Sequence, residues 1–127
     1  MTRKARITAL IPIELPSDAE QVEKATVGRR FIPMIGDSME PTIGARDLVG
    51  VVLYERFDCD GLYVLDVRGH PTVYRCQWAG GDKIDVWFDN PVYRGVKDTL
   101  SRYQFNKLCI GAVFGILHMQ RSHLVGL

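Results

Sequence analysis

One short segment of the chain combines residue types that could perform chemistry together. Residues 36–43 read Gly-Asp-Ser-Met-Glu-Pro-Thr-Ile, with Ser38 as the candidate nucleophile. A serine hydroxyl is a weak nucleophile at neutral pH and needs a neighbouring base to accept its proton. The same residue types also make surface turns, in which Ser38 would cap the turn while Met39 and Ile43 pack inward. An isolated Asp-Ser pair would indicate only a turn, but eight such residues between apolar segments favour a functional site.

The side chains that could bind a metal ion are scattered along the chain. The cysteines are odd in number and lack Cys-x-x-Cys spacing, and no histidine has an acidic partner at metal-ligand spacing. These residues are Cys59, Cys76, Cys109, His70, His118 and His123. No glycine-rich phosphate loop is present in the sequence. We therefore expect reduced thiols in a cytoplasmic protein, with no metal ion and no cofactor.

The segments that must position Ser38 are short and rich in β-forming residues. Apolar and aromatic runs recur about every ten residues and are separated by Gly, Asn, Asp and Pro. The expected strands are residues 48–54, 62–68, 72–78, 83–88 and 107–118. Residues 68–71, Arg-Gly-His-Pro, predict a hairpin between the second and third strands. The pattern predicts a mainly β, compact and largely antiparallel fold.

Helical periodicity is almost absent from the sequence. The only helix candidates are residues 17–24, which Ser17 could cap, and residues 97–103. A helix-turn-helix needs two periodic helices joined by a short turn, so none can be placed in this chain. If the protein belongs to a DNA-binding system, we expect the DNA-reading part to be a separate domain.

Length and charge indicate one small soluble domain. The chain has 127 residues, which suffice for a single core, and 16 basic against 15 acidic residues give a net charge of +1. Gripping nucleic-acid phosphates usually requires a marked basic excess, so any DNA contact is expected to be local or indirect. The longest apolar run, residues 108–117, is about half of a membrane crossing, and no signal peptide is recognisable. We expect a lead-in over residues 1–30 and a folded domain over residues 31–127.

Several segments resemble the LexA-like family of repressors and mutagenesis proteins, which are self-cleaving Ser/Lys peptidases. The matching segments are residues 36–43, 47–49, 61–65, 72–75, 89–93 and 110–115, in family order. The resemblance covers most of the chain from Phe31 onward. It implies the antiparallel β fold of the LexA C-terminal domain and of signal peptidases, with Ser38 as the nucleophile and Met39 setting its loop in place. It also marks as motif residues Gly36, Asp37, Pro41 and Asp47.

The chain departs from this family at the general base. The resemblance implies a lysine in a Val-Lys-Arg sequence, but residues 73–75 read Val-Tyr-Arg. Tyr74 therefore stands in the lysine position, and a tyrosine of ordinary pKa is only about 0.1% ionised at pH 7. Phe88 replaces a small polar residue, and together with Tyr74 it is large enough to fill the cleft of a substrate strand. Other lysines are better explained as surface cations; they are Lys83, Lys97 and Lys107.

A scissile bond is also missing from the sequence. Family members usually carry Ala-Gly or Cys-Gly some way before the serine, and no such dipeptide precedes Ser38. Two independent parts of the reaction are thus absent. We interpret the chain as a pseudo-peptidase in which Ser38 and Tyr74 are vestigial.

The resemblance implies a function in self-association. Family domains without a helix-turn-helix pair two chains, so we predict the C-terminal dimerisation or oligomerisation domain of a phage-type transcriptional repressor. Its expected partners are a second copy of the chain, an antirepressor protein and, through a separate helix-turn-helix domain, operator DNA; no membrane partner is expected. The predicted pairing surface is the apolar C-terminal strand, with Ile110, Val113, Phe114 and Ile116. Two alternatives stay open: an active Ser/Lys peptidase with a relocated base, and a polymerase accessory subunit resembling UmuD.

Overall fold

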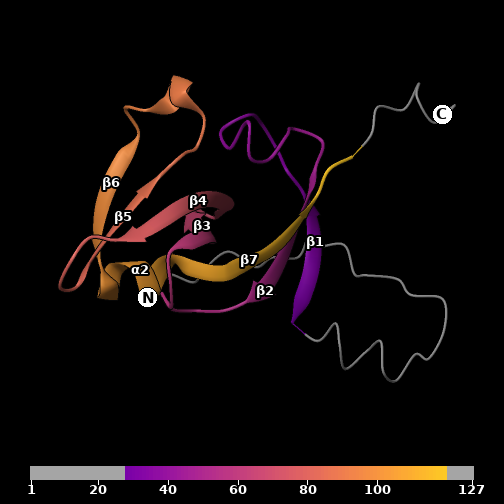
Figure 1. Cartoon of the computed structure of the whole chain (residues 1–127). Helices are drawn as coiled ribbons and strands as arrows, with labels where there is room; N and C mark the ends of the chain where they lie inside the picture. The colour runs from indigo at the N-terminus through magenta and orange to yellow at the C-terminus, as the bar shows by residue number, and fades with distance from the viewer. Residues whose placement is uncertain (1–27, 120–127) are drawn as a thin grey trace, which may run out of the picture.

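The computed structural model describes residues 28–119 (Figure 1). Its strands are β1 (Arg29–Pro33), β2 (Leu48–Leu53), β3 (Gly61–Val67), β4 (His70–Trp78), β5 (Lys83–Trp87), β6 (Lys97–Ser101) and β7 (Cys109–Leu117). A 3-10 turn, η1 (Pro91–Tyr93), separates β5 from β6, and the helix α2 (Arg102–Leu108) precedes β7. The predicted helix over residues 17–24, most of the predicted lead-in and His123 lie outside the described residues. β1 begins at Arg29, two residues before the expected start of the domain.

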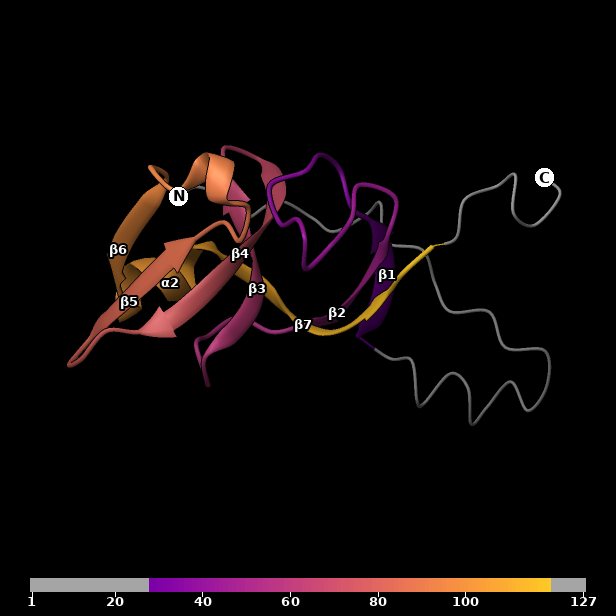
Figure 2. The same ribbon diagram turned by 45° about the horizontal axis from the view of Figure 1, so that its top comes forward.

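The seven strands form a single antiparallel sheet in the order β1-β2-β7-β3-β4-β5-β6. The prediction of a mainly β, largely antiparallel fold is therefore confirmed. The sheet is strongly curved, and Figures 1 and 2 show its β1–β2 end and its β5–β6 end on opposite sides of the molecule. β7 lies inside the sheet, where it pairs with both β2 and β3.

The predicted hairpin around residues 68–71 is confirmed as the connection between β3 and β4. Arg68 and Gly69 form a two-residue turn with φ angles of 52° and 86°. Two consecutive left-handed residues match the twist of the flanking strands, and glycine adopts this conformation without strain. A carboxylate oxygen of Asp66 accepts a hydrogen bond from the Gly69 N–H at 2.7 Å. Because the turn needs only two residues, β4 begins at His70.

The expected helix over residues 97–103 is wrong. Lys97–Ser101 forms β6, which pairs with β5 along its whole length, and the helix begins only at Arg102. Ser101 and Gln104 form a capping box, in which each side chain binds the other residue's backbone N–H. The helix includes Lys107 and Leu108, which were predicted to begin the C-terminal strand. β7 therefore starts at Cys109.

The sheet buries two clusters of apolar side chains. The first lies against the loop between β1 and β2 and contains Met34, Met39, Ile43, Val49, Val51, Val64, Val73 and Ile110. The second lies against α2 and contains Phe57, Tyr63, Leu65, Cys76, Ile84, Val86, Phe105 and Cys109. Successive side chains of a strand point to opposite faces, so neighbours such as Tyr63 and Val64 enter different clusters.

Candidate functional site

Ser38 lies in the loop of residues 34–47 between β1 and β2, which we call the serine loop. The loop is closed at its base, where the Met34 N–H donates to the Asp47 carbonyl at 2.8 Å. Met39 and Ile43 are fully buried in the first cluster, and the Ile43 N–H donates to the Met39 carbonyl at 2.9 Å. Gly36 has a φ of 83°, a conformation that glycine adopts freely. Two apolar anchors and a short turn therefore fix the loop that presents Ser38.

A second segment clasps the serine loop from the side. Asn90 donates from its side chain to the Asp37 carbonyl at 2.8 Å and from its backbone to the Ser38 carbonyl at 3.0 Å. The Tyr93 hydroxyl donates to the Asp37 carboxylate at 2.6 Å, and this bond raises the pKa of Tyr93. Figure 2 shows the serine loop, in violet, beside the orange segment that carries η1. The backbone on both sides of Ser38 is thus held by groups about fifty residues away.

A third contact joins the serine loop to β4. Asp89 accepts two hydrogen bonds from the Arg75 guanidinium, at 2.6 and 2.7 Å, and one from the Thr42 hydroxyl at 2.5 Å. Burial by itself would raise the pKa of Asp89, but the bonds from Arg75 and Thr42 outweigh burial and hold that pKa below its usual value. Arg75, which follows the lysine position, therefore holds the serine loop in place through Asp89.

The Tyr74 ring lies in a stack with Phe88, a side chain that packs against the first cluster. Its neighbour Val73 packs in the first cluster with Met39, whereas Tyr74 packs against the second cluster. Its ring stacks on Phe88 with centroids 4.6 Å apart and planes 18° apart. Burial first, and then the negative charge of Asp98, raise the pKa of the Tyr74 phenol above its usual value.

The structure does not pair Ser38 with a base. Within residues 28–119, the Ser38 hydroxyl has no hydrogen-bond partner, and Tyr74 lines a cavity that Ser38 does not reach. A neutral phenol of raised pKa cannot accept the serine proton. The downstream lysines do not replace it: Lys97 pairs with Asp85 at 3.6 Å, Lys107 lies over the Tyr103 ring, and Lys83 is exposed at the start of β5.

Asp47 has a structural role that the sequence did not reveal. Its carboxylate accepts hydrogen bonds from the Gly44 N–H at 2.7 Å, from the Met119 N–H at 3.0 Å and from His118 at 2.6 Å. His118 therefore has an acidic partner, 71 residues away along the chain. Burial would raise the pKa of Asp47, but these bonds hold it below its usual value. Asp47 fastens the end of β7 to the base of the serine loop.

The four residues of the predicted pairing surface do not share one face. Ile110 is buried in the first cluster, and Val113 and Ile116 pack against that cluster. Phe114 is 44% exposed on the other face, where its ring meets Phe31 edge-on at 5.6 Å. Val51 pairs with Val113 and Gly50 with Gly115, so Phe114 sits at a β-bulge, and periodicity alone could not assign its face.

The described residues hold neither a cluster of metal ligands nor a membrane-spanning helix. Between residues 28 and 119, no three His, Cys, Asp or Glu side chains gather as metal ligands. In the same range, no helix has the length and hydropathy to cross a bilayer. Cys76 and Cys109 are buried in the second cluster, and Cys59 is exposed. No family model matches the chain, and no curated protein sequence matches it.

Proposed function

We propose that the chain is a non-cleaving, LexA-like dimerisation domain of a phage-type transcriptional repressor. One observation carries the loss of cleavage: Tyr74, the residue in the lysine position, is neutral, packs against the second cluster and stacks on Phe88, and among residues 28–119 it makes no hydrogen bond to Ser38. The serine loop is nevertheless held by Asn90, Tyr93 and Asp89. The serine loop is therefore held in place although Ser38 has no base beside it among the described residues. Such a loop is better suited to binding a protein than to catalysis.

The outer face of β1, β2 and β7 supports self-association. Phe114 and Leu117 are 44% and 49% exposed there, and Arg29 lies over the Phe114 ring at 5.6 Å. Phe31 pairs with Gly50 in the sheet and contacts Phe114 above it. We call Phe31, Phe114 and Leu117 the outer apolar patch. An exposed aromatic side chain beside other apolar side chains is typical of interface centres.

The DNA contact belongs, in this proposal, to a separate helix-turn-helix domain. Two copies joined through the outer apolar patch would place their DNA readers on two half-sites of an operator. Because no cleavage would inactivate such a repressor, induction requires a bound antirepressor protein. The domain acts in the cytoplasm.

Light scattering over a concentration series tests the self-association. We expect a monomer–dimer equilibrium that Phe114→Asp weakens by about tenfold or more, because a charge would enter the centre of the interface. Val92→Asp is the matched control, since Val92 is 81% exposed but lies in η1, outside the patch. A strictly monomeric protein, or equal effects of the two substitutions, would contradict this surface.

Incubation at alkaline pH tests the loss of cleavage. Near pH 10 a lysine is partly deprotonated, so a relocated lysine base would become active. We expect the wild-type chain and Ser38→Ala to stay equally intact. A specific product that only the wild type forms would show an active peptidase, and Lys83→Ala and Lys97→Ala would then identify the relocated base.

A further inference from the structure

The antiparallel sheet has two edge strands, β1 and β6, which Figures 1 and 2 show on opposite sides of the molecule. Every second residue of an edge strand points its backbone N–H and C=O away from the sheet. Outward groups that lack a partner can pair with a strand of another chain, so natural edges are usually blocked. The two edges of this sheet differ in this respect.

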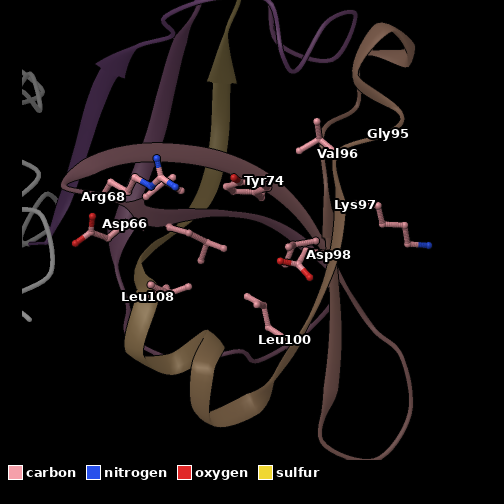
Figure 3. A pocket seen from close by; sticks show the side chains of 12 residues that line it. Asp66, Arg68, Tyr74, Gly95, Val96, Lys97, Asp98, Leu100 and Leu108 are labelled. Carbon is pink, nitrogen blue, oxygen red and sulfur yellow. The ribbon is translucent and has the colours of Figure 1, made fainter.

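The β6 edge is closed by side chains near the edge itself. The residues that bond to β5 alternate with Thr99 and Ser101, whose N–H groups therefore point outward. The Thr99 N–H donates to the Asp98 carboxylate at 2.8 Å, and the Ser101 N–H donates to the Gln104 side chain at 2.9 Å. Figure 3 shows Asp98 on this strand, beside the cavity that Tyr74 also lines. An added strand would therefore find these two donors already in use.

The β1 edge leaves its outward donors open. Gly28 and Met34, which flank β1, both bond to the β2 side at 2.8 Å and continue the register of the two strands. Because bonded residues alternate along an antiparallel strand, the residues of β1 that face outward are Arg29, Phe31 and Pro33. Within residues 28–119, no side chain accepts the N–H of Arg29 or Phe31, and no strand pairs with this edge. Pro33 has no N–H to offer.

One of the outward carbonyls of β1 already has a donor. The Arg30 guanidinium donates to the Arg29 carbonyl at 2.8 Å, which agrees with a carbonyl that points away from β2. The outward acceptors that remain are the carbonyls of Phe31 and Pro33. The edge thus presents donors at residues 29 and 31 and acceptors at residues 31 and 33.

This set of groups is complementary to itself in one antiparallel register. When Phe31 lies opposite Phe31 of a second copy, the two backbones exchange a pair of hydrogen bonds. The Arg29 N–H of each copy then meets the Pro33 carbonyl of the other. Pro33, without an N–H, faces the Arg29 carbonyl that Arg30 already binds. Every outward donor of both copies therefore finds an acceptor.

The neighbouring registers fit less well. Placing Arg30 opposite Arg30 of the second copy sets two like charges against each other, which destabilises a strand pair. Placing Ile32 opposite Ile32 sets Pro33 against the Phe31 carbonyl, which then has no donor, and leaves the Arg29 N–H beyond the end of the other strand. The register with Phe31 opposite Phe31 avoids both defects.

The same register brings the two outer apolar patches together. Phe31 belongs to this patch, and its ring meets Phe114 edge-on at 5.6 Å. Antiparallel strands of two copies are related by a two-fold axis normal to the sheet, so the same face of both copies lies on one side. The two Phe31 rings would meet at this axis, with a Phe114 ring outside each of them. Aromatic side chains opposed across a strand pair stabilise the pair.

We propose that two copies of the chain join by antiparallel pairing of their β1 strands, with Phe31 opposite Phe31, into one continuous sheet. This inference rests on the proposed dimerisation and deepens it, because it names the contact through which the outer apolar patches meet. The serine loops pack on the other face of the sheet, with the first cluster. Both serine loops then lie on the same side of the dimer and are not covered by the contact.

Amide hydrogen exchange of the ¹⁵N-labelled full chain tests the strand pairing. Light scattering gives the Kd of the dimer, and exchange is followed by NMR at about one tenth of this concentration and at about ten times it. We expect the amides of Arg29 and Phe31 to exchange about three- to fivefold more slowly at the higher concentration, because fewer chains are then unpaired. The amides of Thr99 and Ser101 on the other edge are the controls, and their rates should not change.

A mixed sample of ¹³C-labelled and unlabelled chains tests the register. Two antiparallel strands approach most closely at the residue pairs between their hydrogen-bonded pairs. We therefore expect an intermolecular NOE between the Hα atoms of Arg30 and Ile32. An intermolecular NOE that joins Arg30 to Arg30, or Ile32 to Ile32, would show a different register and overturn this one.

Two substitutions of Arg29 separate its N–H from its side chain. Arg29→Pro removes an outward N–H at the first residue of an edge strand, where proline is tolerated. It is expected to raise the Kd of the dimer about tenfold or more, because each copy loses one hydrogen bond to the other. Arg29→Gln is the matched control: it also removes the guanidinium over the Phe114 ring but keeps the N–H, and it should change the Kd less than about threefold.

The outcomes distinguish this contact from dimerisation itself. A dimer whose Arg29 and Phe31 amides exchange at the same rate at both concentrations, or an equal Kd of the two Arg29 variants, would overturn the strand pairing and leave dimerisation standing. Slow exchange of both amides at every concentration would assign the edge to residues 1–27 of the same chain and would also overturn it. A strictly monomeric protein would contradict both proposals. If Arg29→Pro does not fold, the exchange and NOE measurements on the wild type decide.

Discussion

The Arg75 guanidinium binds the Asp89 carboxylate through two hydrogen bonds, of 2.6 and 2.7 Å, and this pair connects β4 with the segment that clasps the serine loop. Asp89 is 10% exposed and Arg75 is 36% exposed. Thr42 of the serine loop donates to the same carboxylate. The rigidity of the loop that carries Ser38 therefore depends on a charge pair outside the loop.

Removing the Arg75 guanidinium should weaken the attachment of the serine loop. Arg75→Gln is expected to lower the free energy of unfolding at neutral pH by about 1–2 kcal/mol, because it leaves the Asp89 charge with Thr42 as its remaining side-chain donor. Urea denaturation followed by circular dichroism measures this change. Arg94→Gln is the control, since exposed Arg94 bonds only a backbone carbonyl, and it should cost less than about 0.5 kcal/mol. Equal losses in the two variants would contradict the role of Arg75.

Acid should weaken the attachment of β7 to the serine loop. The pKa of Asp47 is lower in the folded chain than the unfolded value of about 3.9. Its stabilising contribution is therefore complete above the unfolded pKa and is lost as the pH falls through the lowered, folded value. Denaturation curves between about pH 6 and pH 2 should show a smaller loss of stability in Asp47→Asn than in the wild type. Parallel pH profiles of the two proteins would contradict this assignment.

The close approach of two aromatic rings should make Gly50 intolerant of a side chain. A Cβ at this position would lie 2.8 Å from the Phe114 ring and 3.1 Å from the Phe31 ring. Gly50→Ala is expected to destabilise the chain by about 1–3 kcal/mol. Gly115→Ala is the control, because Gly115 pairs with Gly50 in the sheet but has no atom within 4 Å of its would-be Cβ. Thermal unfolding should show a lower Tm for the first variant alone.

Alkaline titration should distinguish Tyr74 from an activated base. Burial and the Asp98 charge raise the pKa of Tyr74, so its phenolate should form only above about pH 10. The absorbance difference between the wild type and Tyr74→Phe measures this titration. Because the folded pKa exceeds the unfolded one, the corresponding stability is present below about pH 10 and is lost as the pH rises. A phenolate at neutral pH would contradict the pseudo-peptidase interpretation.

The strands were predictable because their signal is local. Apolar runs between turn residues located β2 to β5, and Arg68-Gly69 located the hairpin, with errors of two residues or fewer at the ends. The helix over residues 97–103 was wrong because β6 is stabilised by its partner β5, a contact that no local pattern contains. The Ser101-x-x-Gln104 capping box was a local signal for the true start of α2.

The candidate site was predictable only in its residue types. The motif identified Ser38 and the substitution at Tyr74, but the face to which Tyr74 points depends on where Val73 packs. The partners of Asp37 and Asp47 are Tyr93 and His118, which lie 56 and 71 residues further along the chain. Single-sequence reasoning has no signal for such pairs, because hydrogen bonds between distant segments follow from the register of the whole sheet.

The position of β7 constrains how the protein can be synthesised. β2 and β3 are not neighbours; each pairs with β7, which is synthesised after both of them. Until residue 117 has been made, the nascent chain has two open strand edges at the place where β7 will insert. Such edges invite pairing with other chains. Completion of the sheet therefore waits for the synthesis of β7 and depends on contacts between distant parts of the sequence.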